Sequence, residues 1–223
     1  MYIDRDLPKN ERILLAAEEV FSKYGFEKAT LDEIISLADV GKGTVYKYFG
    51  NKEKLFYKLV YDKNLPFVDR LQQVVAEQTD LSSKLIAYFK EMISFYYENY
   101  ALWQVIYFEM IGARYGCRVQ YVEDNPVVIP RYSMSDISEE VKESVIRYNM
   151  ILADEFNVLK DILLQGLEQG LLKEGNADET RKSLFFGVVM HIFYSVDIVK
   201  KTLTPEEFAT IIVDRFLYGE GKR

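Results

Sequence analysis

The sequence predicts an all-α protein, and three observations support this prediction. Only 5 prolines and 12 glycines occur in 223 residues, so regular elements have few breaks. Apolar residues recur at three- and four-residue steps through most of the chain, which is the period of a helix. We find no convincing series of segments with the two-residue period of a strand. The hydrophobic share of 49% is too high for a disordered chain.

The first two helices are marked by their ends. Residues Lys9–Tyr24 carry one apolar face, and Gly25 follows as a stop signal. Thr30 and Glu33 have the spacing of a capping box, in which each residue satisfies the backbone N–H of the other. The spacing therefore predicts a second, short helix that ends near Asp39.

A third short helix and a fourth, longer one follow. We expect the third over Lys42–Tyr48, closed by Gly50, and the fourth from the N-cap Asn51 onward. Pro66 should interrupt or kink the fourth helix. The second and third helices, joined by a tight turn, form a helix-turn-helix candidate.

Helical patterns continue to the end of the chain, interrupted once. We read Tyr115–Ile137, which is rich in proline and β-branched residues, as a long irregular connection. Asp178 and Thr204 are candidate N-caps. The expected helices of this larger body are Leu81–Asn99, Tyr100–Arg114, about Ser138–Leu172, Asp178–Lys201 and Pro205–Tyr218. We place the boundary between the two domains at residue 57, giving 1–57 and 58–223.

Composition excludes several classes of protein. A single cysteine forbids an internal disulfide, and a single histidine excludes a histidine-rich metal site. The sequence offers no nucleophile–base pair, metal cluster or phosphate-binding loop, so we expect no enzyme, no cofactor and no metal. The charged stretch Met1–Asn10 is unlike a signal peptide, and the longest apolar stretch, 184–196, is too short to span a membrane. We expect a cytoplasmic protein with no membrane partner.

Charge is distributed unevenly along the chain. The net charge is −7, yet Gly41–Lys58 holds five lysines and one glutamate. A local basic patch on an acidic body can dock a polyanion at one end. The alternative is an ordinary solvated lysine face.

The third helix is short and mostly polar. Val45 and Phe49 form its apolar stripe, and the other side chains are of types that donate to phosphate oxygens and base edges. Gly43 allows the backbone to approach another surface closely. Lys52 lies in the first turn of the next helix, where its charge opposes the helix dipole, and this suggests an external anion.

This segment resembles the DNA-binding head of the TetR family of bacterial transcriptional regulators. The match covers about the first sixty residues and agrees in residue type, spacing and helix order. Two positions depart from the family pattern: Asp39 stands in place of the turn glycine and Gly41 in place of the serine cap. The matching residues are Thr30, Ile34, Ala38, Val40, Gly43, Thr44, Tyr46, Lys47, Tyr48, Phe49, Lys52 and Leu55.

The resemblance implies a set of DNA contacts. We expect Thr30, Tyr48 and Lys52 to hold phosphates, whereas Thr30 could instead be only a cap. Tyr46 could instead pack on the first helix. The residues expected in or beside the major groove are Lys42, Thr44, Tyr46 and Lys47, with Gly43 permitting the close approach.

The helical body is rich in aromatic residues, which are most often core residues. Members of the family bind small, often lipophilic molecules between such helices, so we expect an effector pocket here. Its candidate residues are Phe89, Met92, Tyr96, Trp103, Tyr107 and Met110. His191 is read as a core or interface histidine in preference to a ligand contact, and Cys117 as a plain free cysteine in preference to a redox sensor.

The first of the last two expected helices is apolar on nearly every side, as a surface helix should not be. The family dimerises through such a pair, and two-fold symmetry matches a palindromic operator. The expected homodimer interface contains Leu184, Val188, Ile192, Val196, Phe208, Ile212 and Phe216.

These features together predict a ligand-responsive DNA-binding regulator. We expect a repressor that a small, lipophilic or aromatic effector releases from a palindromic operator. A helical enzyme has no residues to support it. A carrier of hydrophobic ligands would explain the aromatic residues, but it would not explain the pattern from Thr30 to Leu55.

Overall fold

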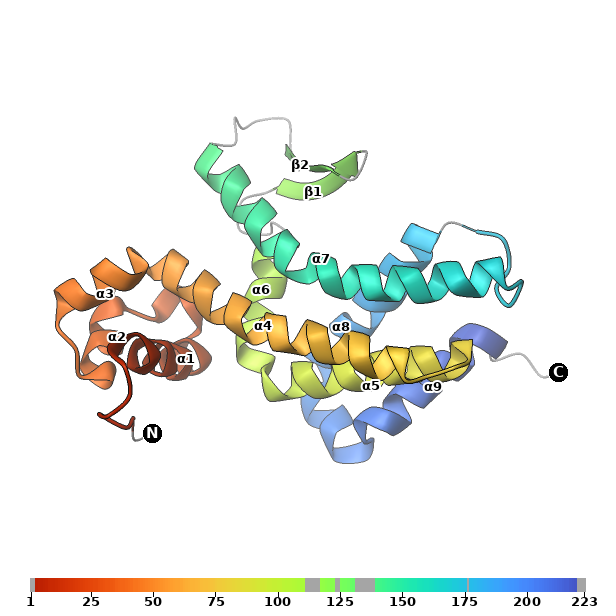
Figure 1. Ribbon diagram of the computed structural model, residues 1–223, viewed down its shortest axis with the longest axis horizontal. Helices are drawn as coiled ribbons and strands as arrows, with labels where there is room; N and C mark the ends of the chain where they lie inside the picture. Colours follow the sequence, from red (N-terminus) through yellow and green to blue (C-terminus); the bar gives the residue numbers. More distant parts are fainter. Residues whose placement is uncertain (1–2, 111–116, 123–124, 131–138, 176, 220–223) are drawn as a thin grey trace. The chain divides into compact units, whose positions relative to one another are not determined.

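The computed structural model describes residues 3–110, 117–122, 125–130, 139–175 and 177–219. Within these ranges it contains nine helices and one β-hairpin (Figure 1), which confirms the predicted all-α class. The helices are α1 Lys9–Lys28, α2 Leu31–Ala38, α3 Lys42–Phe49, α4 Lys52–Ala76, α5 Leu81–Glu98, α6 Tyr100–Met110, α7 Glu139–Glu168, α8 Ala177–Thr202 and α9 Pro205–Tyr218. In the part of the chain that the structure describes, no helix is both long and apolar enough to cross a membrane.

The chain forms two compact units. The first unit comprises Met1–Leu65 and Ala101–Ile151, and the second comprises Pro66–Tyr100 and Leu152–Arg223. The first unit thus contains the predicted head together with a later part of the chain. A separate head ending at residue 57 stays a prediction.

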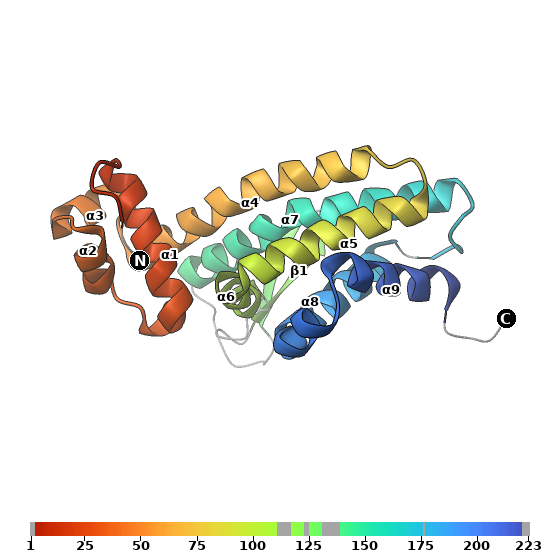
Figure 2. The same ribbon diagram turned by 90° about the horizontal axis from the view of Figure 1, so that it is seen from below.

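Helices α1, α2 and α3 lie together (Figure 2), and an apolar core holds them. The side chains of Ile13, Ile34 and Val45, one from each helix, are buried. The rings of Phe21 and Phe56 meet edge to face with centroids 4.9 Å apart, so the start of α4 is joined to α1. Because Val45 is buried in this core, the opposite side of α3 faces solvent.

Local signals set the ends of the head helices, as the sequence predicts. Gly25 has φ 72° and ψ 170°, which breaks α1 before its last few residues. Thr30 and Glu33 form both hydrogen bonds of the capping box. Asp39 takes a left-handed conformation (φ 52°, ψ 54°), as a turn glycine would. The Asn51 side chain accepts a hydrogen bond from the backbone N–H of Lys54 at 2.8 Å.

The expectation that Pro66 interrupts the fourth helix is wrong, and the alternative that it kinks the helix stays a prediction. Helix α4 runs from Lys52 to Ala76 with Pro66 inside it. Proline removes one donor, which would otherwise bond to the carbonyl of Asp62, but the remaining backbone bonds continue the helix. Pro66 is also the residue at which the chain passes from the first unit to the second.

The long irregular connection predicted for Tyr115–Ile137 contains a β-hairpin instead. Strand β1 (Cys117–Val122) pairs antiparallel with β2 (Asn125–Pro130), and Cys117 lies opposite Pro130. Pro126 and Pro130 suggested a loop, but both strands of a two-stranded hairpin are edges, where proline is tolerated. Residues 111–116, 123–124 and 131–138 lie outside the described ranges.

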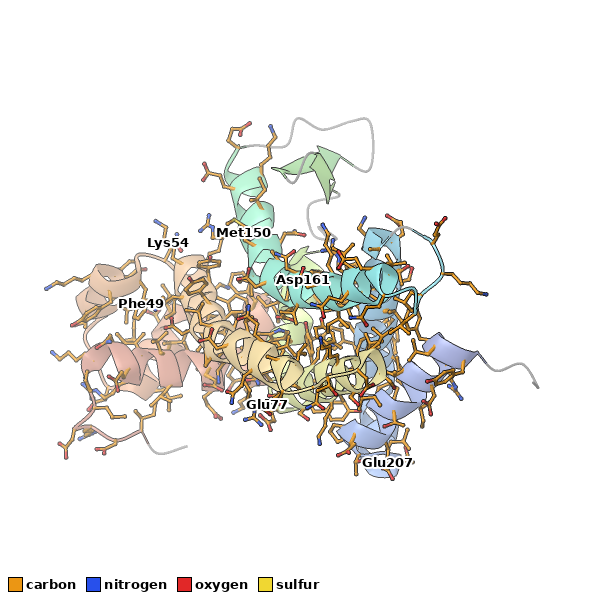
Figure 3. All side chains as sticks on the ribbon, turned by 45° about the vertical axis from the view of Figure 1, so that its right-hand side comes forward. Phe49, Lys54, Glu77, Met150, Asp161 and Glu207 are labelled. Atoms are coloured by element: carbon orange, nitrogen blue, oxygen red, sulfur yellow. The ribbon has the colours of Figure 1, made fainter. Side chains whose placement is uncertain are left out.

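Helix α5 is central to the second unit, where it packs against α9 and α8. An ion pair between Lys90 and Glu206, at 2.7 Å, joins α5 to α9. Thr204 and Glu207 form a capping box at the start of α9, where Figure 3 labels Glu207. The prediction that Asp178 is the N-cap of α8 is wrong, because the helix already begins at Ala177.

Candidate nucleic-acid interface

The helix-turn-helix is positioned by a few buried residues. Ile34 and Ala38 of α2 and Val45 of α3 are almost fully buried, and α1 packs against both helices. In the turn, the backbone N–H of Val40 donates to the carbonyl of Ile35 at 3.3 Å. The left-handed Asp39 reverses the chain there, so that α3 can leave α2 at a steep angle.

Helix α3 turns most of its polar side chains outward. Tyr46 is 47% exposed and Tyr48 is 52% exposed. Lys42, Gly43 and Lys47 are also exposed, whereas Thr44 is half-buried. The exposure of Tyr46 does not favour the alternative that this ring is buried against α1. A helix that presents tyrosine and lysine in this way can donate to phosphates and base edges.

The five lysines of the basic patch differ in their surroundings. Lys42 pairs with Asp32 at 3.3 Å, and Lys58 pairs with Asp62 one turn along α4. Among the described residues, neither Lys47 nor Lys54 has an acidic partner within 4 Å. The uncompensated positive charge is therefore concentrated at the end of α3 and the start of α4.

Contacts within the chain explain why Lys52 occurs in the first turn of α4. Its Nζ donates to the carbonyls of Phe26, Glu27 and Ala29 at 2.8, 3.3 and 3.1 Å. These carbonyls lie at the end of α1, where a helix attracts a positive charge. The hint of an external anion drawn from the dipole of α4 is thus unnecessary, and the phosphate contact of Lys52 stays a prediction.

Replacing Thr30 by Ala should lower the free energy of unfolding by about 1 kcal/mol, because the N-terminus of α2 loses its cap. Glu33→Ala breaks the same capping box without touching the expected phosphate contact. If Thr30 also holds a phosphate, Thr30→Ala weakens DNA binding about tenfold more than Glu33→Ala does. Urea denaturation and DNA-binding titrations on both variants measure this, and equal losses of affinity would contradict the contact.

The residues predicted for an effector pocket belong to both units. Phe89, Met92 and Tyr96 are buried in the second unit, while Trp103 is buried and Tyr107 half-buried in the first. Met110 is the last residue of α6, and its side chain lies outside the description. The pocket stays a prediction. An open hollow of about 530 Å³ in the second unit is lined by other residues, among them Leu163, Leu167 and Phe216.

The predicted dimer residues divide by burial. Val188, Ile192 and Phe208 are buried within their own chain, whereas Leu184, Ile212 and Phe216 are half-buried. The side chain of Val196 lies outside the description. His191 is exposed and its ring lies 4.9 Å from that of Phe208, so the core reading of His191 is wrong and the interface reading stays a prediction.

Sequence reasoning missed the buried polar residues, among them Glu155 on α7, which has no exposed surface. A signal was present, because Glu155 shares a helical face with the apolar residues Leu152 and Leu159. Within the described ranges, no group of three or more His, Cys, Asp or Glu residues could hold a metal ion.

The fold and the exposed face of α3 define a helix-turn-helix transcriptional regulator with a helical body. A family model described as "Bacterial regulatory proteins, tetR family" matches residues 13–59. Residues 13–59 thus match the DNA-binding head of this family, and the proteins that the chain resembles are transcriptional regulators, not enzymes.

Relatives resemble the chain over most of its length. The "Fatty acid metabolism regulator protein" of Bacillus subtilis is 24% identical over 182 residues, which are 82% of this chain and 80% of the relative. The crystal structure of the Bacillus subtilis regulator FadR in complex with stearoyl-CoA has a TM-score of 0.68 at 21% identity, covering 95% of this chain and 99% of that one. The fatty acid degradation regulator FadR of Bacillus halodurans has a TM-score of 0.70 at 22% identity, covering 99% and 100%. At these identities the two structures support the fold alone.

Proposed function

We propose that this chain is a homodimeric repressor that binds a palindromic operator and releases it when a small lipophilic effector binds to the helical body. One observation carries the DNA-binding part of the proposal. Helix α3 is anchored by buried Val45 and exposes Tyr46, Lys47 and Tyr48, so it can enter the major groove without unpacking the head.

Fatty acyl thioesters are the first effectors to test. A relative of the same fold is a regulator that forms a complex with stearoyl-CoA. The second unit of this chain has an apolar, aromatic interior in which Phe89, Tyr96 and Phe185 are buried. An interior of this kind suits a ligand with a long hydrocarbon chain.

The proposed mechanism is a shift between two conformers of a dimer. Two recognition helices reach successive major grooves only if they lie ~34 Å apart. An effector that binds better to a conformer with another spacing lowers DNA affinity by the coupling free energy, typically ~1–3 kcal/mol. The exposed residues of α8, among them Tyr194 at 80% exposure, are available to a second subunit.

Selection of bound duplexes from a random DNA pool tests this function. We expect enriched palindromic sites, and affinity that falls steeply with salt because each neutralised phosphate releases counterions. Stearoyl-CoA should release the selected duplex, and coenzyme A without the acyl chain is the matched control. A protein that enriches no duplex at low ionic strength would contradict the proposal.

Replacing Pro66 by Ala should change the response to the effector more than it changes the affinity for DNA. The substitution restores a backbone donor inside α4, at the residue where the chain enters the second unit. We expect operator affinity without effector to stay within about twofold, and the concentration of effector needed for release to change by more than about fivefold. Titrating effector against the bound complex measures this, and an unchanged midpoint would exclude a role for Pro66.

A further inference from the structure

Glu155 of α7 is a carboxyl group with no access to solvent inside the second unit. The hydroxyl of Tyr96, from α5, donates to its Oε2 at 3.1 Å. The hydroxyl of Tyr88, about two turns earlier on the same face of α5, donates to the main-chain carbonyl of Glu155 at 3.1 Å. Its other oxygen, Oε1, is also buried and has no hydrogen-bond partner in the described part of the chain.

Burial favours the protonated form of this carboxyl group. Burial raises the pKa of Glu155 to about 8, and the exposed carboxylate of Asp154 raises it slightly further, while the hydrogen bond from Tyr96 acts in the opposite direction. Two further titratable groups interact with this cluster, because burial and Glu155 raise the pKa of Tyr88 on α5 and Arg181 on α8 lowers it. Arg181 lies over the ring of Phe156, with 5.4 Å between its guanidinium carbon and the ring centre. A protonated carboxyl group whose Oε2 accepts the hydrogen bond from Tyr96 holds its proton on Oε1.

The packing around the group does not require a carboxyl. Its surroundings are aromatic: the rings of Phe156 and Phe185 are 4.2 Å apart, and the ring of Tyr96 lies edge to face with Phe185 at 6.4 Å. A buried O–H donor without an acceptor destabilises a fold, and a leucine or methionine would avoid this. A buried polar group without a partner and with a shifted pKa is typical of a functional site.

We propose that Glu155 is the polar anchor of the effector site in the second unit, where its Oε1–H donates a hydrogen bond to an uncharged carbonyl oxygen of a lipophilic ligand. This inference rests on the proposed effector function and names the chemistry of that ligand. A cationic ligand fits less well, because it would require an ionised carboxylate in an apolar interior.

Two probes of equal chain length, 2-undecanone and undecane, isolate the carbonyl contribution. Their dissociation constants for the full-length protein are measured by headspace gas chromatography between pH 6 and pH 9. We expect the ketone to bind about tenfold more tightly than the alkane at pH 6.5, because one buried hydrogen bond changes a dissociation constant by about this factor. This preference should disappear as the pH rises through 8 and Glu155 ionises.

Two variants separate the anchor from a structural role. Glu155→Gln keeps a donor, so it should retain the preference for the ketone at every pH. Glu155→Met removes the donor and should bind both probes equally, with unchanged affinity for undecane. Operator binding by both variants verifies that they fold.

Several results would overturn the inference. One is equal binding of the two probes by the wild type, as expected if Oε1 only holds an internal water. A second is a ketone preference that survives in Glu155→Met. A third is binding of dodecyltrimethylammonium that strengthens with pH and is lost in Glu155→Gln, which would assign a cation to an ionised Glu155. If these occur while operator binding persists, the anchor fails and the DNA-binding function stands.

Discussion

A protein carrying Lys47→Ala together with Tyr48→Ala should bind its operator at least about 100-fold more weakly than the wild type. Each side chain is expected to contribute ~1–3 kcal/mol through contacts to phosphates or base edges. Both are exposed on α3, so the free energy of unfolding should change by less than about 0.5 kcal/mol. Fluorescence anisotropy with a labelled duplex at several salt concentrations measures the loss.

The chain offers a matched control for this double variant. Tyr24 and Lys28, on α1, are an exposed tyrosine and an exposed lysine in the same head, so Tyr24→Ala with Lys28→Ala changes composition and charge identically. We expect the control to keep affinity within a few-fold. Because the variant with Lys47→Ala and Tyr48→Ala lacks one lysine that is expected to contact phosphate, the slope of log affinity against log salt should be smaller by about one than for the wild type. Similar losses in both double variants would mean that α3 is not the DNA-reading element.

The free energy of unfolding of the wild type should fall as pH rises from about 5 to 8. The fall is measured relative to the Glu155→Gln variant, which has no carboxyl group at this position. The pKa of Glu155 is about 8 in the folded chain and close to 4.3 in the unfolded chain. Between these values the folded state holds a proton that the unfolded state has lost. Stability then decreases with pH, by up to about 1.4 kcal/mol per pH unit.

Urea denaturation at pH 5, 6, 7 and 8 measures this slope. The stabilising effect is fully present below the unfolded pKa and is lost as pH rises through the folded one. Asp154→Asn is the matched control, since it makes the same chemical change at the exposed neighbouring residue. It should leave most of the slope intact. A wild type and a Glu155→Gln variant with parallel pH profiles would mean that Glu155 is already ionised in the folded state.

The head could be predicted in detail because its signals are local. The capping box joins Thr30 to a residue three positions away, the Asn51 cap spans the same distance, and Asp39 depends only on its own backbone preference. Each of these is visible in a window of four residues. The same reasoning placed the start of α9, where Thr204 and Glu207 repeat the motif.

Features that depend on distant partners could not be predicted in the same way. Lys52 is satisfied by carbonyls more than twenty residues earlier, so its charge looked unfavourable when only α4 was considered. Glu155 is defined by Tyr96, 59 residues away, and a single carboxyl on an apolar helix face gives no indication of its partner. The hairpin could not be predicted because proline in a sequence indicates a break in a strand. Only the pairing of the two strands shows that Pro126 lies at an edge, where proline is tolerated.

The ion pair between Lys42 and Asp32 has a consequence for how the head discriminates among polyanions. A duplex that takes Lys42 must first displace a carboxylate attached to the protein itself, and that carboxylate does not diffuse away as a salt ion would. If Lys42 contacts DNA as predicted, Asp32 is a tethered competitor for it, so unspecific phosphate chains should gain little at this position, whereas a well-fitted groove compensates the exchange with further contacts.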